Sequence, residues 1–261
     1  MSDPANPAKQ RLAAGQPAIG FNIRQSRTAD IAQIAKTCGY DWLFIDMEHG
    51  ALDLETAAQI SIAALAVGVA PIVRVPGFEH HHATRALDAG ALGIVVPHVD
   101  TAEQARRIAD QCRFPPKGHR SIVGNLPQLG FEAMPAAQAM TKADAATLLV
   151  VMIETEQAVA NADAIAAVDG IDVLLVGSND LAADMGIPGQ FGDPKLDRAY
   201  DVVIAAAKRH GKHAGLGGIY EEKLMGHFIR KGAHFVLGGS DLSFMMAGAK
   251  SRAAFLRSQT L

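Results

Sequence analysis

The chain has 261 residues, a length typical of one α/β barrel, which takes about 250 residues. Hydrophobic residues make up 49% of the chain and charged residues 20%, so we expect a large core and no extended disorder. The 24 Lys and Arg and 27 Asp and Glu give a net charge of -3 without any basic run, which argues against nucleic acid as a partner.

Short β-type runs alternate with amphipathic helical patterns along the chain. The strand-like runs are nearly continuously apolar and fall at residues 18–23, 42–47, 70–75, 92–97, 147–153, 171–177, 212–217 and 234–239. Helical patterns follow them at residues 28–38, 53–67, 79–89, 101–112, 155–167 and 197–210, and after each of the last two runs. The sequence therefore predicts eight strands, each followed by a helix.

The number and composition of these repeats predict a (β/α)8 TIM barrel. Parallel strands that are covered on both faces are apolar over their whole length, as these are. Eight such repeats close most simply into a barrel, here a single domain over residues 1–261 with a short lead-in at 1–15. The alternative is an open doubly wound sheet, which has a glycine-rich turn after its first strand. Residues 22–28, NIRQSRT, contain no glycine.

The N-terminal segment and the cysteines favour a soluble cytoplasmic protein. The opening MSDPANPAKQRLAAG has neither the basic n-region nor the apolar stretch of a signal peptide. No later apolar run is long enough to span a bilayer, so no membrane association is expected. Cys38 and Cys112 lie far apart without a CxxC partner, which is typical of reduced thiols.

Polar residues gather where the predicted strands end. The active sites of such barrels lie at the carboxyl ends of the strands. The residues found there are Asp46, Glu48, His49, Arg74, Pro97, His98, Glu154, Ser178, Asn179 and Asp180. The irregular stretch at 113–134, rich in Pro and Gly, is either a functional loop or a surface excursion.

Glu154 and Asp180 follow neighbouring strands and are candidate metal ligands. Two carboxylates held side by side repel each other unless a cation lies between them. Two oxygen ligands leave several coordination positions for water and substrate, which is typical of Mg²⁺ or Mn²⁺ in an open catalytic site. The structural alternative is a separate salt bridge from each carboxylate to a nearby Arg or Lys.

Arg74 and His49 are the candidate catalytic side chains near this metal. The Arg74 guanidinium would bind a substrate carboxylate through two hydrogen bonds, pair with Asp46 on the neighbouring strand, or do both. A lone histidine such as His49 is more often a surface residue, a helix cap or a core imidazole. A carboxylate that orients the ring would favour a general base, and Asp88 is the candidate.

These residues resemble the motifs of the HpcH/HpaI aldolase family, the metal-dependent class II pyruvate aldolases of the phosphoenolpyruvate/pyruvate barrel superfamily. The resemblance covers roughly residues 15–255. The motifs are D-M-E-H-G at 46–50, R-V-P at 74–76, D-A-G-A at 88–91, P-P-K-G-x-R at 115–120, I-E-T at 153–155 and V-G-S-N-D-L at 176–181. Each motif is weak alone, and together they are specific.

The resemblance implies a role for each of these residues. Glu154 and Asp180 would bind the divalent cation, Mg²⁺ or Mn²⁺ with Co²⁺ or Zn²⁺ as alternatives, and Arg74 would contact the pyruvyl group. His49 paired with Asp88 would be the acid/base dyad. Backbone amides around Ser178 and Asn179 would hold the ketoacid carboxylate.

The resemblance also implies an oligomer. Members of the family are often hexamers, trimers of dimers that exchange the last barrel helix. The corresponding segment here is DLSFMMAGAKSRAAFLR at 241–257, which by itself would equally suit packing on its own barrel.

The chain departs from the family pattern at Met152, where many relatives carry Gln two residues before the metal-binding Glu. A polar contact near the ketoacid is lost there, and substrate preference does not transfer. His98, where many relatives have another residue, either compensates for this loss or contacts the aldehyde side.

The expected reaction is reversible aldol cleavage of a 4-hydroxy-2-oxoacid to pyruvate, or hydroxypyruvate, and an aldehyde. The divalent metal and Arg74 would stabilise the enolate charge, and His49 would take the C4 hydroxyl proton. An imine route is disfavoured because Lys212, the nearest candidate, lies at the amino end of its strand. The alternatives are a CoA-ester lyase of the citrate lyase β type, against which the DMEHG histidine argues, and a non-catalytic ketoacid-binding protein.

Overall fold

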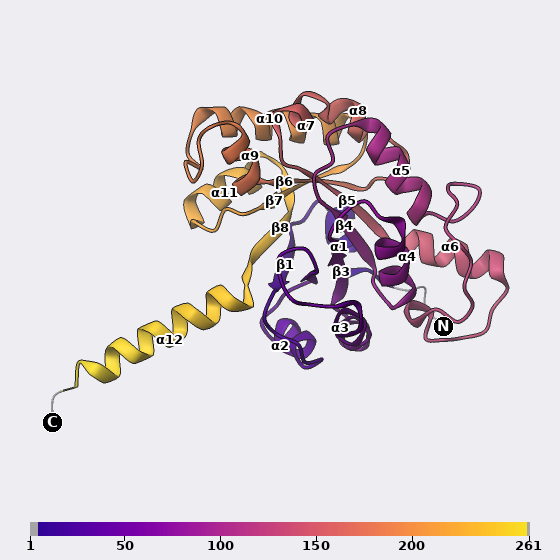
Figure 1. The fold of residues 1–261 in the computed structure, drawn as a ribbon, viewed down its shortest axis with the longest axis horizontal. Coiled ribbons are helices and arrows are strands. Elements are labelled where there is room, and N and C mark those ends of the chain that lie inside the picture. The colour runs from indigo at the N-terminus through magenta and orange to yellow at the C-terminus, as the bar shows by residue number, and fades with distance from the viewer. Residues whose placement is uncertain (1–4, 260–261) are drawn as a thin grey trace.

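Eight parallel strands close into a barrel in the computed structural model, which describes residues 5–259 (Figure 1). The strands pair in sequence order, and the first pairs with the last. They are β1 (Ala18–Ile23), β2 (Trp42–Asp46), β3 (Ala70–Arg74), β4 (Gly93–Val96), β5 (Leu148–Ile153), β6 (Val173–Gly177), β7 (His213–Gly217) and β8 (Ala233–Ser240). The predicted (β/α)8 fold is confirmed, and the closure excludes an open doubly wound sheet.

Helices surround the barrel and follow the predicted patterns with some differences. They are α1 (Pro7–Ala13), α2 (Ile31–Thr37), α3 (Leu54–Val67), α4 (His80–Asp88), α5 (Ala102–Cys112), α6 (Ala136–Ala146), α7 (Glu156–Ala160), α8 (Ala162–Ala166), α9 (Ser178–Asp184), α10 (Pro194–Arg209), α11 (Glu222–Lys231) and α12 (Asp241–Arg257), with a 3-10 turn η1 (Pro127–Leu129). The helix predicted at 155–167 is divided at Asn161, whose amide donates to the Asp100 carbonyl (2.7 Å). Within residues 5–259, no helix combines the length and apolarity needed to cross a bilayer.

Alternate side chains of each strand point into the barrel or outward to the helices. In β2, Leu43 and Ile45 pack in the outer core beneath the helices, whereas Trp42 and Phe44 pack inside the barrel. Trp42 stacks on Phe235 with 4.0 Å between ring centroids. A Cβ on Gly20 would lie 2.2 Å from the indole, so the large Trp42 ring requires glycine on the neighbouring strand. Bulky side chains therefore fill the lower part of the barrel.

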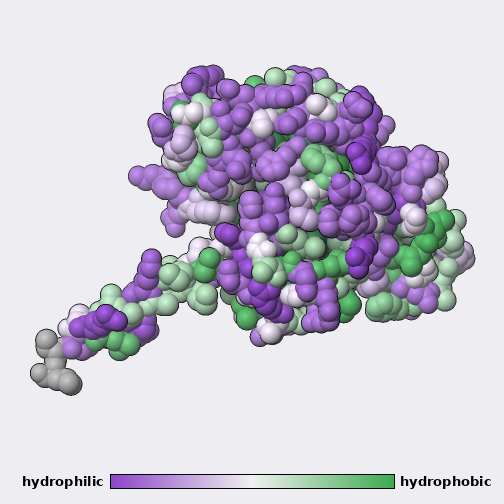
Figure 2. Space-filling model, in the orientation of Figure 1, coloured by the Kyte–Doolittle hydropathy of each residue, from purple (hydrophilic) through white to green (hydrophobic). Residues whose placement is uncertain are grey.

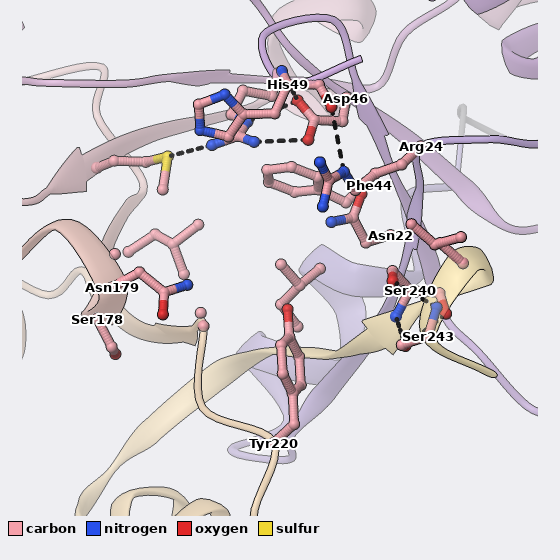
Figure 3. A pocket seen from close by; sticks show the side chains of 18 of the residues that line it. Asn22, Arg24, Phe44, Asp46, His49, Ser178, Asn179, Tyr220, Ser240 and Ser243 are labelled. Carbon is pink, nitrogen blue, oxygen red and sulfur yellow. Dashed lines mark hydrogen bonds and ion pairs between the residues drawn. The ribbon is translucent and has the colours of Figure 1, made fainter. Parts of the chain in front are cut away.

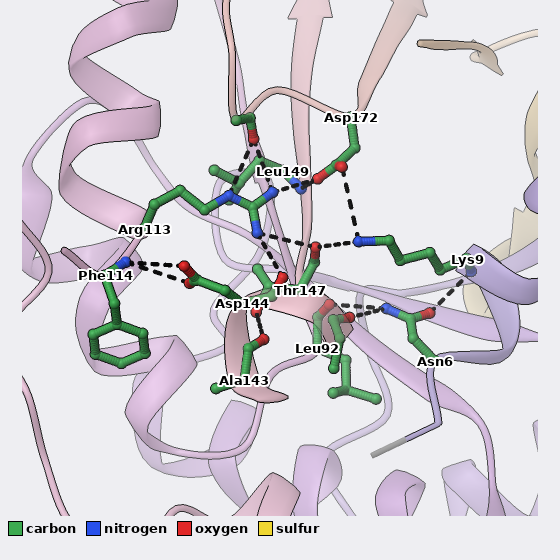
Figure 4. A network of polar contacts seen from close by, with 12 residues as sticks. Asn6, Lys9, Leu92, Arg113, Phe114, Ala143, Asp144, Thr147, Leu149 and Asp172 are labelled. Carbon is green, nitrogen blue, oxygen red and sulfur yellow. Dashed lines mark hydrogen bonds and ion pairs between the residues drawn. The ribbon is translucent and has the colours of Figure 1, made fainter. Parts of the chain in front are cut away.

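A buried polar network ties the N-terminal segment to the base of the barrel (Figure 4). The Asn6 amide donates to the backbone carbonyls of Leu92 (3.0 Å) and Ala146 (2.8 Å). Arg113 donates to the Asp172 carboxylate (2.5 Å), which also lies 3.9 Å from the Lys9 ammonium. The lead-in predicted at 1–15 thus contains a helix, α1, that packs across this end of the barrel.

Helix α12 extends away from the barrel (Figure 1), and green apolar side chains are visible along it in Figure 2. Phe244 is 46% exposed and Met245 59%, and near the other end Phe255 is 54% and Leu256 60% exposed. Asp241, the first residue, is the helix's buried residue. The barrel of this chain therefore leaves apolar side chains of α12 uncovered.

Asp241 anchors the start of α12 to the loop after β1. Its carboxylate accepts hydrogen bonds from the backbone N–H groups of Arg24 (3.1 Å), Gln25 (2.9 Å) and Ser26 (2.7 Å). Burial alone would raise the pKa of Asp241, but these hydrogen bonds outweigh burial and lower the pKa below 3.8. A lowered pKa means that the ionised carboxylate stabilises the fold above pH 3.8, and that this contribution is lost as the pH falls through the folded-state pKa.

Asp241→Asn should therefore lower the free energy of unfolding by about 1–3 kcal/mol at neutral pH, the range for a charged hydrogen-bonding group. Denaturant unfolding of both proteins as a function of pH would measure the difference. We expect it to be constant above pH 4 and to shrink in more acidic buffer. A difference that grows on acidification would contradict this role.

Both cysteines are free thiols. Cys38 is exposed, and Cys112 lies buried at the end of α5. Burial raises the pKa of the Cys112 thiol to about 12, so it stays protonated and behaves as a small apolar side chain. The two thiols are not bonded to each other.

Candidate active site

A pocket of about 450 Å³ opens at the carboxyl ends of the strands (Figure 3). Its floor is apolar, formed by Phe44, Leu175 and Leu237 from the barrel interior. Its wall is polar and contains Asn22, Arg24, Asp46, His49, Arg74, Ser178, Asn179, Asp180 and Tyr220. Most of the predicted site residues therefore share one cavity, at the edge where the sequence placed them.

Arg74 and Asp46, the last residues of β3 and β2, form a buried two-point ion pair. Nε of Arg74 donates to Oδ1 of Asp46 (2.9 Å), and Nη2 donates to Oδ2 (2.6 Å). Burial alone would raise the pKa of Asp46, but Arg74 and the backbone N–H groups of Glu48 and His49 together lower it. The guanidinium is thus held in a fixed orientation, with N–H groups left over for a ligand because it has five donors.

Glu48 is a site residue that the sequence placed at the strand end but gave no role. Its Oε2 lies 2.7 Å from Nη1 of Arg74, in an ion pair without hydrogen-bond geometry. Its Oε1 lies 3.4 Å from Nε2 of His98, and Oε2 lies 4.0 Å from Nε2 of His49. Glu48 thus joins Arg74 to both histidines.

Glu154 is buried at the end of β5, with 2% of its surface exposed. Its Oε2 accepts a hydrogen bond from the backbone N–H of His98 (2.8 Å). Its carboxylate lies over the backbone of Gly177, where an added Cβ would come within 2.6 Å of Oε1. Burial raises the pKa of Glu154, and although His98 opposes this, the nearby negative charges of Asp180 and Glu48 raise it further.

These surroundings fit a divalent cation bound by Glu154 and Asp180. Burial and, to a smaller extent, the charge of Asp180 disfavour the ionised form of Glu154, and a cation between the two carboxylates would relieve this. Among the described residues, no group of three or more His, Cys, Asp or Glu side chains is arranged to hold a metal. Two protein carboxylates, with other positions open to water and substrate, suit a hard cation such as Mg²⁺ or Mn²⁺.

The start of α9 supplies backbone donors to the pocket. Ser178, Asn179 and Asp180 form its first turn, where N–H groups have no partner within the helix. The Ser178 hydroxyl is buried and bonded to the Tyr200 hydroxyl (2.7 Å). Ser178 can therefore contact a ligand in the pocket through its backbone, whereas its side chain fixes the helix to α10.

His49 and Asp88, the predicted acid/base dyad, are not brought together within this chain. His49 is exposed at the pocket wall, and its nearest carboxylate in an ion pair is Glu48. Asp88 ends α4 and pairs instead with Arg120 (2.7 Å) from the 113–134 loop. Part of the predicted loop thus serves to hold Asp88.

His98 has an unusual backbone conformation, with a φ of 55°. Such a left-handed conformation is uncommon for a residue other than glycine and often marks a functional site. It lets both the backbone N–H and Nδ1 of His98 face Glu154, with Nδ1 at 3.2 Å from Oε2. Met152, in place of the Gln of many relatives, lines the pocket with its sulfur 3.9 Å from Nη1 of Arg74.

Besides Ser240 and Ser243, whose hydroxyls cap α12, three polar pocket residues were missed by the sequence analysis: Asn22, Arg24 and Tyr220. They lie in or after β1 and β7, whereas the comparison of strand ends covered only the second to the sixth strand. Extending the same comparison to every strand would have found Arg24, one residue after β1. Tyr220 lies three residues beyond β7 and needed the loop geometry.

Comparison with known proteins identifies relatives along almost the whole chain. Residues 24–247 match the family described as HpcH/HpaI aldolase/citrate lyase. A 4-hydroxy-4-methyl-2-oxoglutarate aldolase from Hapsidospora irregularis is 41% identical, over 94% of this chain and 92% of its own. A hydroxypyruvate/pyruvate aldolase from Agrobacterium fabrum is 36% identical, over 93% and 90%. The crystal structure of an HpcH/HpaI aldolase from Desulfitobacterium hafniense has a TM-score of 0.92 at 28% identity, covering 98% of both chains.

Similarity of this extent, on a barrel with its polar residues at one mouth, defines the protein as a carbon–carbon lyase of the aldolase class. The chain belongs to the HpcH/HpaI aldolase/citrate lyase family. The resemblance seen in its motifs is thereby confirmed.

Proposed function

We propose that this enzyme cleaves 4-hydroxy-2-oxoacids reversibly to pyruvate, or hydroxypyruvate, and a second carbonyl compound. Supporting this reaction, the pocket holds an oriented guanidinium, and the buried carboxylate of Glu154 lies against Gly177 of the pocket lining, with its pKa raised by burial and, to a smaller extent, by Asp180. The names of the relatives from Hapsidospora and Agrobacterium describe reactions of this type. The alternative is a CoA-ester lyase of the citrate lyase β type, and the description of the family as a whole includes the words citrate lyase.

The cation that Glu154 and Asp180 would hold is a Lewis acid, which stabilises negative charge on a carbonyl oxygen as the carbon–carbon bond breaks. Mg²⁺ and Mn²⁺ fit the oxygen donors best. Asp46 holds Arg74 so that its remaining N–H groups meet the oxoacid, and Asp46 therefore acts as a positioning residue.

His49 is the proposed base for the C4 hydroxyl proton, since it lies on the pocket wall. Asp88 remains the proposed partner of His49. Within one chain Asp88 binds Arg120, so its pairing with His49 would need a contact that a single chain does not make. The first-turn N–H groups at Ser178 and Asn179 would bind the oxoacid carboxylate, as helix N-termini bind anions.

Turnover assays with and without metal test this function. The protein should release pyruvate from 4-hydroxy-2-oxopentanoate with Mg²⁺ or Mn²⁺, lose this activity in a chelator, and regain it when the metal is returned. Full activity in the chelator, with a borohydride-trapped pyruvate adduct, would establish an imine route instead. Acyl-CoA cleavage without oxoacid cleavage would establish the alternative lyase, and tight oxoacid binding without turnover would indicate a binding protein.

We also propose that the chain assembles through α12. The helix extends from the barrel with apolar side chains exposed, which is unfavourable for an isolated chain and is relieved when a second copy covers them. Exchange of this helix in pairs, and three such pairs in a hexamer, is the arrangement that the resemblance to the family implies. An oligomer fits a cytoplasmic enzyme, a location that the two free thiols favour.

Light scattering on the purified protein would measure the assembly. We expect a hexamer for the full chain, and smaller species when Phe244 and Met245 are both replaced by Ser. The pair Lys250→Ser and Arg252→Ser, on the same helix, is the matched control and should leave the mass unchanged. A full-length chain that stays monomeric at high concentration would contradict the proposal.

A further inference from the structure

Arg24 brings a second cation into the pocket, and no described carboxylate pairs with it. It follows β1 directly, and its backbone N–H is fixed by Asp241 (3.1 Å). Its Nε donates to the His49 carbonyl (3.2 Å), which fixes the plane of the guanidinium. Figure 3 shows the rest of the group pointing into the cavity beside the Asn22 amide.

Asn22 adds a buried polar group without a partner. The residue is 7% exposed, and its Oδ1 has no hydrogen-bond partner among residues 5–259. Buried amide groups are almost always hydrogen-bonded. The unsatisfied Oδ1 can accept from a donor such as a ligand hydroxyl, whereas the NH2 group of the same amide is the part that can donate to a carboxylate. The amide lies on the same side of the pocket as Arg24 (Figure 3).

The Tyr220 hydroxyl points into this part of the pocket from the β7 side (Figure 3). Burial raises the pKa of Tyr220, although the positive charges of Arg24 and Arg74 oppose that effect. Its hydroxyl stays protonated at neutral pH and can donate a hydrogen bond. Ser240 and Ser243 also line the pocket, but their hydroxyls are used in the capping box of α12.

The two cations of the pocket differ in charge balance. Arg74 is neutralised by Asp46 and lies close to Glu48 as well. Arg24 has no such partner among the described residues. An anionic group of a ligand beside it would therefore form an ion pair with a guanidinium that no protein carboxylate already neutralises. A guanidinium with free N–H groups is suited to binding a carboxylate through two hydrogen bonds.

We propose that Arg24, Asn22 and Tyr220 form a subsite for a second carboxylate, carried by the part of the substrate that leaves as the carbonyl product. This proposal rests on the proposed aldol cleavage and specifies its substrate class. The substrate would be a 4-hydroxy-2-oxoacid with a carboxylate on C4. The released partner would then be a 2-oxoacid, not a neutral aldehyde.

The chemistry balances for such a substrate. The C4 hydroxyl loses its proton to the base, and the C4–O bond becomes the carbonyl of the released oxoacid. The electron pair of the C3–C4 bond remains on C3 as the enolate of pyruvate, which then takes up one proton. The second carboxylate is unchanged throughout, so the subsite contributes to binding and orientation.

Two substrates that differ only at C4 test the proposal: 4-hydroxy-2-oxopentanedioate, with a carboxylate, and 4-hydroxy-2-oxopentanoate, with a methyl group. With Mg²⁺ present, the wild-type enzyme should have the higher kcat/KM for the dioate. Arg24→Gln should lower the ratio of the two kcat/KM values by about 10- to 100-fold, the effect of losing hydrogen bonds to a charged group. Arg24→Lys keeps the positive charge but cannot form two parallel hydrogen bonds to a carboxylate, and it should lower the ratio less.

Arg27→Gln is the matched control. Arg27 donates to the Ala51 carbonyl (2.7 Å), in the same loop that Arg24 contacts, but does not line the pocket. The ratio should therefore be unchanged in this variant. Equal losses for both substrates in Arg24→Gln would show that Arg24 merely supports the loop, and would overturn the subsite.

Exchange of the pyruvate methyl protons with deuterated water separates this proposal from the proposed function. Exchange requires only the enolate half of the reaction. Wild-type enzyme that exchanges pyruvate but shows no preference for the dioate would overturn the subsite and leave the aldolase function intact. Absence of both exchange and cleavage in the presence of the metals would overturn the proposed function and the subsite with it.

Discussion

Glu154→Gln is expected to lower kcat/KM for aldol cleavage by about 1000-fold, equivalent to roughly 4 kcal/mol of transition-state stabilisation. The substitution keeps the size of the side chain and removes the charge that the cation would need. The Glu154 carboxylate is held by the His98 N–H and lies against Gly177, so no other carboxylate can take its position without a shift of the backbone. Binding of Mn²⁺, followed by electron paramagnetic resonance, should weaken in parallel.

Gly177→Ala tests the same position without changing any charge. The added methyl group would collide with Oε1 of Glu154 at 2.6 Å, and the φ of −86° is one that alanine adopts freely. We expect a folded protein with weakened Mn²⁺ binding. Glu156→Gln, two residues farther on at the start of α7, is the control that should bind Mn²⁺ as the wild type does. Unchanged Mn²⁺ affinity in Glu154→Gln would refute the metal site.

Arg74→Lys should cost about 2–4 kcal/mol of transition-state stabilisation, as expected for losing one preorganised charged donor. A lysine has one nitrogen and cannot span both oxygens of Asp46 while also facing Glu48 and the ligand. The positive charge beside Asp46 is retained, so the loss should appear in kcat/KM more than in folding. Steady-state kinetics and thermal unfolding of the same preparation would separate the two effects.

Arg85→Lys, on the exposed face of α4, controls for the exchange of Arg for Lys and should change neither measurement. Near-normal kinetics in Arg74→Lys would exclude a role for the guanidinium in the reaction. A large loss of thermal stability with an unchanged kcat would assign the buried pair to folding alone.

The strands could be predicted closely because parallel strands buried on both faces carry a signal along their whole length. Ala18–Ile23 and Leu148–Ile153 are apolar or small at nearly every position, and the predicted runs match them to within one residue. The helices were predicted less completely. α1, α6 and α9 were missed because α1 and α9 are short, and α6 lies directly after the Pro- and Gly-rich stretch at 113–134.

Which residues share the site could be predicted where it depends on strand ends alone. Asp46, Arg74 and Asp180 reach one pocket because their strands end at the same side of the barrel. The partners of individual side chains could not be predicted in this way. Asp88 pairs with Arg120 through the course of a long loop, and Glu48 contacts His98 through a left-handed backbone turn. Neither contact can be predicted from the spacing of residues in the sequence.

The filled interior of the barrel has a consequence for the order of events in the pocket. Trp42 stacked on Phe235 closes the space below, and Asn6 and α1 cover the far end. Ligands therefore enter and leave through a single mouth. The product bound deeper in the pocket can leave only after the product nearer the solvent has dissociated. Adding the outer product to the solution should therefore slow the release of the inner one.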